Sequence, residues 1–494
     1  MIRFTLVMLV LGAIAVYAWR DWYKALCGLI LVVGVVQHPD FPNSMGGIQG
    51  ANPWNLALAS IVLAWWSQRQ RDGVRWDMPG YVNALLCVYL AVVLVSWLRL
   101  AMGRTIYLSH LSSAYLVSEY LVNCLKWVVP GLLLFDGCRD RRRLLLGVGA
   151  TLGLYVVLAL QVIRWMPPSM MLDGEALADR SLKILVNEIG FHRVNLSMML
   201  AGASWAIFAC LVLAKRRVHQ ILLALVGVAV VYGQALTAGR TGYVTWAVVG
   251  LGLCAIKWRK YLLLGPVVAL MLLIAVPGAI ERLSQGFGGQ EVDRYVVTAG
   301  RNIAWPVIID KITDSPLVGY GRQAMQRTGL AARLWNEHGE SFPHPHNAYL
   351  EMLLDNGAVG FLLVMPFYVV ILVHAIRLFR DRRDPMFQAV GGMTCALVLA
   401  LLVAAVGSQT FYPREGAVGM WCAMGLMLRL WVVRSQMPAA VPAPAAYWPG
   451  DAEPAMAGPP DAAGPVPPDG RDWWRPDSAP ARPEAAGDLV WNRS

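Results

Sequence analysis

HPHNAYLEMLLDNGAVGFLLVMPFYVVILVHAI, residues 344–376, joins a polar start to the longest apolar run of the chain. A helix needs only about 20 apolar residues to cross a bilayer core, so this run predicts a membrane-spanning helix. Asn347 is a favourable N-cap for a helix that begins at Ala348. Asn347, Glu351 and Asp355 follow one another at four-residue intervals and form one polar stripe. Because charged groups are costly in lipid, we expect this stripe to face a cavity or the interior of a helix bundle.

Apolar runs recur along most of the chain. Of its 494 residues, 57% are hydrophobic and only 15% are charged, and the mean hydropathy is +0.50. These values exclude an ordinary soluble protein and predict an all-α polytopic membrane protein with about 12 or 13 transmembrane helices. The expected spans lie near residues 4–19, 23–37, 54–66, 80–98, 113–135, 144–165, 192–213, 218–236, 241–256, 261–279, 347–376, 386–408 and 415–433.

The net charge of +11 comes from short basic clusters between the apolar runs. This arrangement follows the positive-inside rule, so we expect no nucleic-acid partner. If the helices alternate in direction, six clusters share one side, which we predict to be cytoplasmic. They are Arg69, Arg71 and Arg75; Arg139 and Arg141–Arg143; Lys215–Arg217; Lys257, Arg259 and Lys260; Arg377, Arg380, Arg382 and Arg383; and Arg429 with Arg434. The outer side then carries one large periplasmic loop, residues 280–346, and shorter loops at 38–53, 99–112, 166–191 and 409–414.

The composition divides the chain into three parts. Residues 1–190 are predicted to form amino-terminal membrane helices, and residues 191–434 a membrane core that includes the loop 280–346. Residues 435–494 are rich in Pro, Ala and Gly and lack an apolar period, so we predict a disordered cytoplasmic tail. The eight cysteines show neither CxxC nor CxxH spacing, and we expect neither a disulfide framework nor a zinc site.

Arginines stand next to membrane helices on the predicted outer face. Arg240 lies in YGQALTAGRTGYVTW, residues 232–246, where Gly239 and Gly242 permit a tight turn between two spans. Arg193 follows His192 at the outer start of another span. Arg240 also has a simpler interpretation, as a snorkelling residue that anchors a helix end.

A third arginine, Arg301, precedes an amphipathic segment in the large outer loop. In AGRNIAWPVIIDKITDSPLVGYGR, residues 299–322, a helical spacing places Arg301, Trp305, Ile308 and Ile309 on one face. We expect an interfacial helix there, and an arginine in such a helix can also bind lipid headgroups.

Together, these residues suit a particular chemistry. The planar fork of arginine binds phosphate oxygens, and a histidine such as His344 or His346 can take a proton from a hydroxyl near neutral pH. The set fits displacement of a pyrophosphate leaving group by an alcohol. Two histidines can also bind a metal, but no third ligand is close in sequence and there is no DxD motif. We therefore expect the reaction to need neither a metal nor another cofactor.

The chain resembles the O-antigen ligase and polymerase superfamily. His346 and Asn347, then nine residues, Gly357, two more residues and Gly360 fit the pattern H-[NSQ]-x9-G-x-x-[GTY] of that superfamily. Residues from about 192 to 430 share this resemblance, since TAGRTGYVTWAVVGL is similar to its arginine-bearing helix pair. GRNIAWPVIIDKITDSPLVGYG is similar to its R-x3-W segment, which ends in G-x-G.

The resemblance implies a GT-C-like enzyme of the bacterial inner membrane. Such enzymes move a glycan from undecaprenyl diphosphate to an acceptor hydroxyl at the periplasmic face. By position, His346 would activate the acceptor, and Arg240 and Arg301 would hold the diphosphate. His344, Asn347, Glu351 and Arg193 are expected to line the substrate site, and membrane lipids are expected to surround the protein.

Several functions stay open at this point. The acceptor would be lipid A core, a growing polysaccharide or a protein, the last as in a protein O-oligosaccharyltransferase. A solute or ion transporter is an alternative of another class, but its ionisable groups should lie at the middle of the membrane. A scaffold for polysaccharide export would not need His346.

Overall fold

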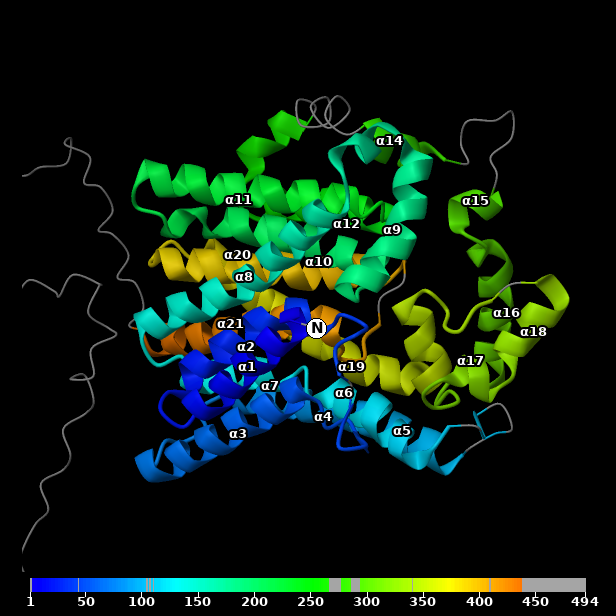
Figure 1. Ribbon diagram of the computed structural model, residues 1–494, viewed down its shortest axis with the longest axis horizontal. Helices are drawn as coiled ribbons and strands as arrows, with labels where there is room; N and C mark the ends of the chain where they lie inside the picture. The colour runs from blue at the N-terminus through cyan, green and yellow to red at the C-terminus, as the bar shows by residue number, and fades with distance from the viewer. Residues whose placement is uncertain are drawn as a thin grey trace, which may run out of the picture.

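The structure, a computed structural model, describes residues 2–42, 44–103, 105, 108–109, 111–265, 277–285, 294–339, 341–407 and 410–437. Nearly all the regular structure in these ranges is helical (Figure 1). The α-helices are α1 (Ile2–Tyr17), α2 (Trp22–Val36), α3 (Pro53–Asp72), α4 (Gly80–Met102), α5 (Ser113–Val117), α6 (Asn123–Leu125), α7 (Val129–Gly137), α8 (Arg141–Trp165), α9 (Gly174–Ile189), α10 (Arg193–Cys210), α11 (Arg217–Leu236), α12 (Arg240–Ile256), α14 (Pro277–Ser284), α15 (Arg294–Thr298), α16 (Arg301–Asp314), α17 (Ala324–Arg327), α18 (Leu330–His338), α19 (Ala348–Arg380), α20 (Pro385–Ala404) and α21 (Val418–Gln436).

Shorter elements complete this part of the chain. A π-helix, η2 (Ser118–Val122), joins α5 to α6. The 3-10 turns are η3 (Pro168–Leu172), η4 (Leu211–Leu213), η5 (Arg259–Leu264) and η6 (Glu415–Ala417). Two short strands, β1 (Ser44–Met45) and β2 (Ile48–Gln49), pair antiparallel.

Eight helices within the described residues are long and apolar enough to cross a membrane. They are Gly80–Met102, Ser113–Gly137, Arg141–Trp165, Arg193–Leu213, Arg217–Leu236, Ala348–Arg380, Pro385–Ala404 and Glu415–Gln436. Three shorter apolar helices, Phe4–Tyr17, Trp22–Val36 and Arg240–Ile256, coincide with further expected spans. The prediction of an all-α polytopic membrane protein is therefore confirmed.

Two expected spans, at residues 54–66 and 261–279, are not among the eight long helices. Helix α3 covers residues 54–66 but is not among the eight, because its last six residues, SQRQRD, are all polar. The span expected at 261–279 falls largely on residues 266–276, outside the described ranges, as do residues 438–494 of the expected tail. The count of 12 or 13 spans, the three-part division and the disordered tail stay predictions.

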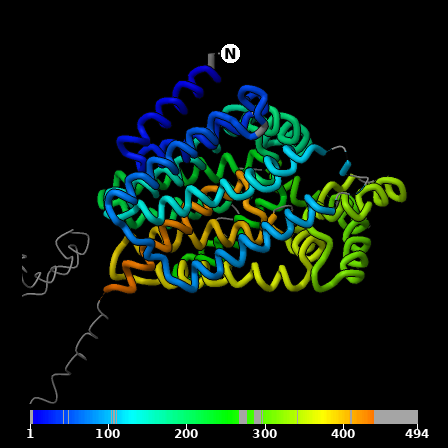
Figure 2. Tube along the Cα trace, turned by 90° about the horizontal axis from the view of Figure 1, so that it is seen from below, coloured from blue at the N-terminus to red at the C-terminus, as the bar shows by residue number. Residues whose placement is uncertain are grey.

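Helices α10 and α20 form the centre of the bundle. The Cβ of an alanine at Gly202 on α10 would lie only 2.8 Å from the Cβ of Ala400 on α20. Small residues allow such close approach of membrane helices. Helices α8, α11 and α12 pack around α10, and α19 and α21 pack against α20 (Figure 1). Helix α1 packs on α2 and α3 at the margin of the bundle (Figure 2).

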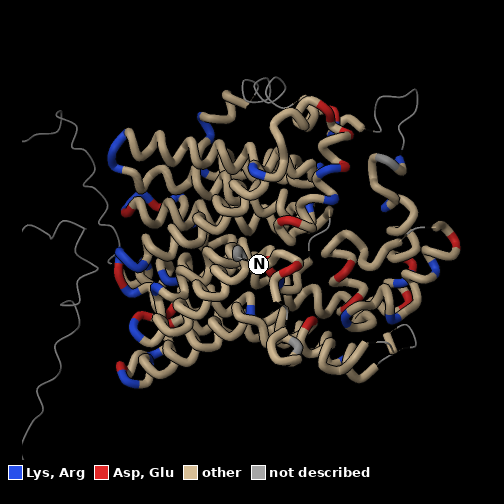
Figure 3. The backbone as a smooth tube through the Cα atoms, in the orientation of Figure 1, with Lys and Arg blue, Asp and Glu red and all other residues tan. Residues whose placement is uncertain are grey.

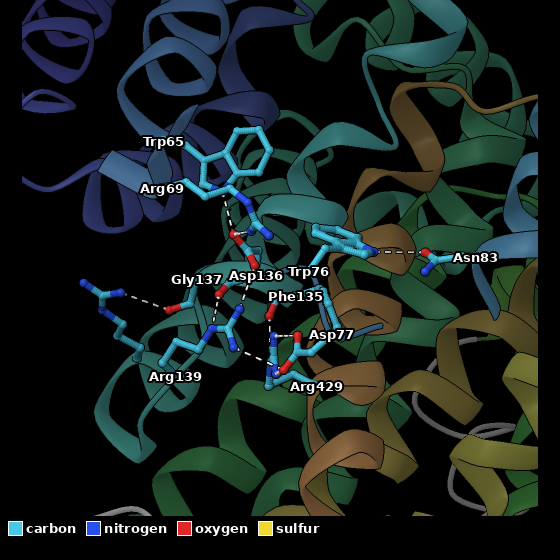
Figure 4. Close-up of polar contacts among 11 residues, drawn as sticks. Trp65, Arg69, Trp76, Asp77, Asn83, Phe135, Asp136, Gly137, Arg139 and Arg429 are labelled. Atoms are coloured by element: carbon cyan, nitrogen blue, oxygen red, sulfur yellow. Dashed lines mark hydrogen bonds and ion pairs between the residues drawn. The ribbon is translucent and has the colours of Figure 1, made fainter. Parts of the chain in front are cut away.

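Ion pairs join the basic clusters at one end of the bundle (Figure 4). Asp136 on α7 pairs with Arg69 on α3 and with Arg139, whose Nη2 lies 2.7 Å away. Asp77 pairs with Arg139 at 3.1 Å and with Arg429 on α21 at 2.6 Å. Three clusters that are far apart in the sequence thus meet in one network.

Two further clusters lie at the same end, which we call the basic end. Asp381 pairs with Arg383 at 2.7 Å and with Arg434 at 2.8 Å. Lys257 donates through Nζ to Oε1 of Gln388 at the start of α20, at 2.6 Å. Lys and Arg gather along this end in Figure 3. The prediction that the clusters share one side is confirmed for these five.

The opposite end, which we call the outer end, carries α9 and α14 to α18 (Figure 1). Residues 166–191 were expected to be a loop, and this is wrong because most of them form α9. Leu177, Leu185 and Ile189 of α9 are buried at helical spacing, and Asp173 caps the helix by accepting from the backbone N–H of Glu175. Their apolar stripe is too short to span a membrane but long enough to pack α9 on the bundle.

The expected amphipathic helix after Arg301 is present as α16. Its buried face consists of Ala304 and Ile308, with Arg301 and Trp305 partly buried beside them. Ile309 was expected on the same face but is 48% exposed. Helices α16 to α18 share a small apolar core of their own, which includes Leu354 of α19.

Candidate functional site

The polar start of α19 is followed by a sharp break in the helix at Gly357. Gly357 has φ +64° and ψ −171°, a backbone conformation that residues other than glycine rarely adopt. A Cβ at this position would lie 2.2 Å from the backbone carbon of Leu317. A Cβ at Gly360 would lie 2.3 Å from that of Asn356. Both glycines of the sequence pattern are therefore required by the shape of this break.

The break is held open by the outer segment 316–321. Ala358 donates its N–H to the carbonyl of Pro316 at 2.8 Å, and Tyr320 donates to the carbonyl of Leu354 at 2.9 Å. Gly319 has φ +58°, and its Cα lies so close to Leu354 that a Cβ would meet the carbonyl oxygen of Leu354 at 2.6 Å. The backbone groups that the broken helix leaves unpaired are thus satisfied by this segment.

Just before α19, two histidines lie side by side. Asn347 caps the helix as predicted, with its side chain accepting from the N–H groups of Tyr349 and Leu350. The rings of His344 and His346 have centroids 4.1 Å apart. Trp305 of α16 donates to the carbonyl of Pro345 at 3.0 Å and so fixes the turn between them.

The backbone of His346 is in the left-handed region, with φ +52°. For a residue other than glycine this conformation is uncommon and persists only where surrounding contacts impose it. The ring of Phe342 contacts the ring of His346 edge to face, with centroids 5.6 Å apart. The His346 imidazole is thus held in one place at the outer end.

Both imidazoles are kept uncharged. Burial, and then the positive charges of Arg414 and Arg301, lower the pKa of His344 to about 4. Burial, then His344 and Arg301, lower the pKa of His346 to about 3. A neutral imidazole accepts a proton or hydrogen bond at pH 7.

Arg301 and the start of α12 converge on one backbone turn after α20. Arg301 donates through Nη2 to the carbonyl of Gly407 at 2.5 Å. A Cβ at Gly407 would lie 2.3 Å from Cγ2 of Thr241, the residue after Arg240. Arg301 also acts electrostatically on Arg240. The two arginines that the sequence singled out are therefore brought together.

The turn before Arg240 differs from the one expected. Ala238, rather than a glycine, has positive φ (+54°), while Gly239 has φ −82°. Gly242 instead permits close packing, since a Cβ there would lie 1.7 Å from Oγ of Ser197 on α10. This contact joins the outer ends of α10 and α12, and Arg193 at the start of α10 donates to the carbonyl of Ala178 at 2.8 Å.

Arg282 belongs to the same group, and sequence reasoning missed it. It lies on the short helix α14 and acts electrostatically on both Arg193 and Arg240. Asp179 of α9 offsets part of this charge. The sequence predicts a loop over residues 280–346, so nothing in it places Arg282 near the other arginines. We call Arg193, Arg240, Arg282 and Arg301 the arginine group.

A large cavity lies beside His344. Its volume is about 740 Å³, and its wall includes His344 and Glu351. His346, Arg240, Arg301 and Arg193 are not among its lining residues. Asp355 is buried next to it, where it accepts from the hydroxyl of Tyr412 at 3.0 Å. The polar stripe on α19 thus faces the interior, as predicted.

Two charged residues of the helix Ser113–Gly137, Glu119 and Lys126, also belong to this cavity. Both residues line the cavity, and Lys126 donates through Nζ to Oδ1 of Asn55 at 3.1 Å. Glu119 lies within the π-helix η2, which changes the helical register before Lys126. Within the described residues, no group of three His, Cys, Asp or Glu is placed to hold a metal ion.

Comparison with known proteins points to one family. Residues 203–365 match the protein family described as O-Antigen ligase. This range contains Arg240, Arg301, the two histidines and Gly357, whereas Arg193 lies before it. No curated protein matches the chain.

Proposed function

We propose that this chain, a membrane protein of the O-antigen ligase family through residues 203–365, is a glycan transferase of the bacterial inner membrane. It takes a glycan from undecaprenyl diphosphate and passes it to an acceptor hydroxyl at the periplasmic face. One observation carries this proposal: an uncharged His346 lies next to an arginine of a group with excess positive charge, at the end of the bundle opposite the basic end.

The arginine group suits the leaving group of this reaction. Guanidinium groups bind phosphate oxygens through two parallel N–H bonds, and they do so more strongly where water is partly excluded. Arg301 is half-buried and already oriented by Gly407. We propose that Arg240 and Arg301 hold the diphosphate, with Arg193 and Arg282 adding to the positive field.

His346 would take the proton of the acceptor. The acceptor oxygen forms a bond to the anomeric carbon of the glycan, and the bond from that carbon to the phosphate oxygen breaks. The electron pair leaves with undecaprenyl diphosphate, and the acceptor proton moves to the imidazole of His346. His344, Asn347 and Glu351 position these groups: Asn347 by capping α19, and His344 and Glu351 by lining the adjoining cavity.

The low pKa of His346 in the absence of donor has a physical consequence. A base with a pKa of about 3 has little drive to accept a proton at pH 7. A bound diphosphate would neutralise nearby arginines and add negative charge, and both changes raise the pKa of His346. Donor binding would therefore activate His346 as a base. Without a donor, His346 would not take a proton from a hydroxyl.

Replacement of His346 at the native locus tests the proposal. His346→Asn is the preferred variant, because asparagine tolerates the positive φ of this position better than alanine does. We expect glycan to accumulate on the polyprenyl diphosphate carrier, measured by mass spectrometry. Single repeat units would indicate a polymerase, long chains a lipid A core ligase, and loss of protein glycosylation an O-oligosaccharyltransferase.

A matched control is His338→Asn, at the exposed end of α18 in the same outer region. It should leave carrier-linked glycan unchanged. If His346→Asn inserts normally and the carrier pool stays unchanged, the histidine is not catalytic. Reduced uptake of a solute in that variant would instead favour a transporter.

A further inference from the structure

The 740 Å³ cavity differs in chemistry from the arginine group beside it. It is enclosed by the segment before α3, the π-helix η2 with α6, the turn after Gly321 and the residues before η6. A volume in this range accommodates a ligand larger than a single small metabolite. His344 is in its wall and touches His346, so the cavity opens beside the proposed base.

Charges in the cavity wall are balanced. Lys126, Arg322 and Arg414 are matched by Glu119, Glu351 and Glu415. Arg414 and Glu415 form an ion pair at 3.2 Å. A diphosphate would meet carboxylates here, whereas it meets a predominantly positive site in the arginine group. The cavity therefore suits a neutral ligand that both donates and accepts hydrogen bonds.

Aromatic side chains supply the remaining wall. The rings of Trp54 and Trp127 lie 4.7 Å apart, with the ammonium of Lys126 over both. The guanidinium of Arg322 lies between the rings of Tyr120 and Tyr412, at 5.1 and 4.2 Å from their centroids. Aromatic faces contact the C–H faces of sugar rings, while carboxylates and amides bind their hydroxyls.

The π-helix η2 contributes three neighbouring residues to this wall: Ser118, Glu119 and Tyr120. A π-helix is rare and is frequently found at functional sites. Here it turns Glu119 and Tyr120 toward the cavity that Lys126, seven and six residues further along the chain, also lines. The presence of the unusual π-helix η2 in the cavity wall is consistent with a binding site rather than a gap in packing.

We propose that this cavity binds the terminal sugars of the acceptor, an uncharged oligosaccharide, and presents its hydroxyl to His346. The proposal rests on the function proposed above and narrows the acceptor from a glycan or a protein to a glycan. Donor diphosphate and acceptor sugars would then occupy opposite sides of the two histidines.

Binding of a free oligosaccharide tests this assignment. The probe is the repeat-unit oligosaccharide released by mild acid from the carrier lipid of the host, titrated into the full chain in lipid nanodiscs by calorimetry. Loss of one charged hydrogen bond should weaken binding about tenfold. We expect this for Glu119→Ala and for Lys126→Met. Because the side chain of Glu119 is exposed, its removal should leave the fold intact.

Arg240→Ala separates the two sites. It should bind the oligosaccharide as wild type does while losing affinity for a farnesyl diphosphate probe. The assignment is overturned if wild type does not bind the oligosaccharide, if both cavity variants bind it normally, or if Arg240→Ala weakens it equally. Binding of a Ser/Thr peptide in place of the oligosaccharide would also overturn it and favour a protein acceptor. If instead His346→Asn fails to block transfer while sugar binding persists, the catalytic proposal fails and the cavity assignment does not.

Discussion

The imidazole rings of His344 and His346 lie 4.1 Å apart, one in the wall of the cavity and the other next to Arg301. His344 thus borders a charge-balanced, aromatic compartment, and both imidazoles are within electrostatic reach of Arg301 in the arginine group. A transferase that joins a glycan on a diphosphate to a second molecule needs two such compartments with a base between them.

Arg301→Ala should lower kcat/KM for the carrier-linked donor about 100-fold, since it removes a preorganised charge from the leaving group. Arg301→Lys keeps the positive charge but not the planar guanidinium that binds phosphate through two N–H groups, so it should recover only part of the lost kcat/KM. The measurement is transfer by purified protein at several donor concentrations. Arg333→Ala on α18 is the control, because Arg333 forms an exposed pair with Glu337. Equal activity of Arg301→Ala and the control would exclude Arg301 from the donor site.

Gly357→Ala should destabilise the protein by about 2–5 kcal/mol, because it combines backbone strain with a clash against Leu317. Thermal unfolding in detergent measures the effect. Gly149→Ala is the matched control: it lies within α8 with nothing within 4 Å of the added Cβ. That variant should be neutral or gain up to about 1 kcal/mol. Equal unfolding temperatures would mean that the break at Gly357 is absent in solution.

The depressed pKa of His346 also predicts how stability depends on pH. Between about pH 3 and 6.5 the unfolded chain binds a proton at this residue and the folded protein does not, so acidification destabilises the fold. At pH 5 this penalty is on the order of 2 kcal/mol. His346→Asn removes it, so the variant should gain stability relative to wild type as pH falls from 7.5 to 5. A difference that stays constant across this range would refute the low pKa.

Metal independence is the next prediction. The arginine group is proposed to neutralise the departing diphosphate, so transfer should persist in EDTA at the rate seen without chelator. The assay is glycan transfer by chelator-treated protein, with Mg²⁺ or Mn²⁺ added back to parallel samples. Loss of activity in EDTA that either ion restores would show that a divalent cation shares this task.

Local signals in the sequence were sufficient for much of this site. Asn347 was recognisable as a cap, Arg301 and Trp305 as one face of a helix, and the stripe from Glu351 to Asp355 as an inward face, because each depends on neighbours within one or two turns. The break at Gly357 was not foreseen. It depends on segment 316–321, some 40 residues away, and only the folded chain shows why this glycine is needed.

Other features of the site could not be predicted because they also depend on residues far apart in the sequence. Arg282 joins the arginine group only because α14 packs against α9, and Gly174 donates its N–H to Glu281 at 2.8 Å. The cavity is assembled from five separate stretches, and Arg322 gave no sign of facing it. A π-helix also has no distinctive sequence pattern, so the register of Glu119 and Lys126 could not be assigned in advance.

The most direct test of the account is the pKa of His346 with and without a bound diphosphate. It is measured by ¹⁵N-histidine NMR of the full chain in nanodiscs, with the His346→Asn variant assigning the signal and farnesyl diphosphate as the probe. We predict a pKa near 3 in the free protein and a marked rise toward neutrality when the probe is bound. A pKa that does not change while farnesyl diphosphate binds would place the diphosphate away from His346 and contradict the proposed mechanism.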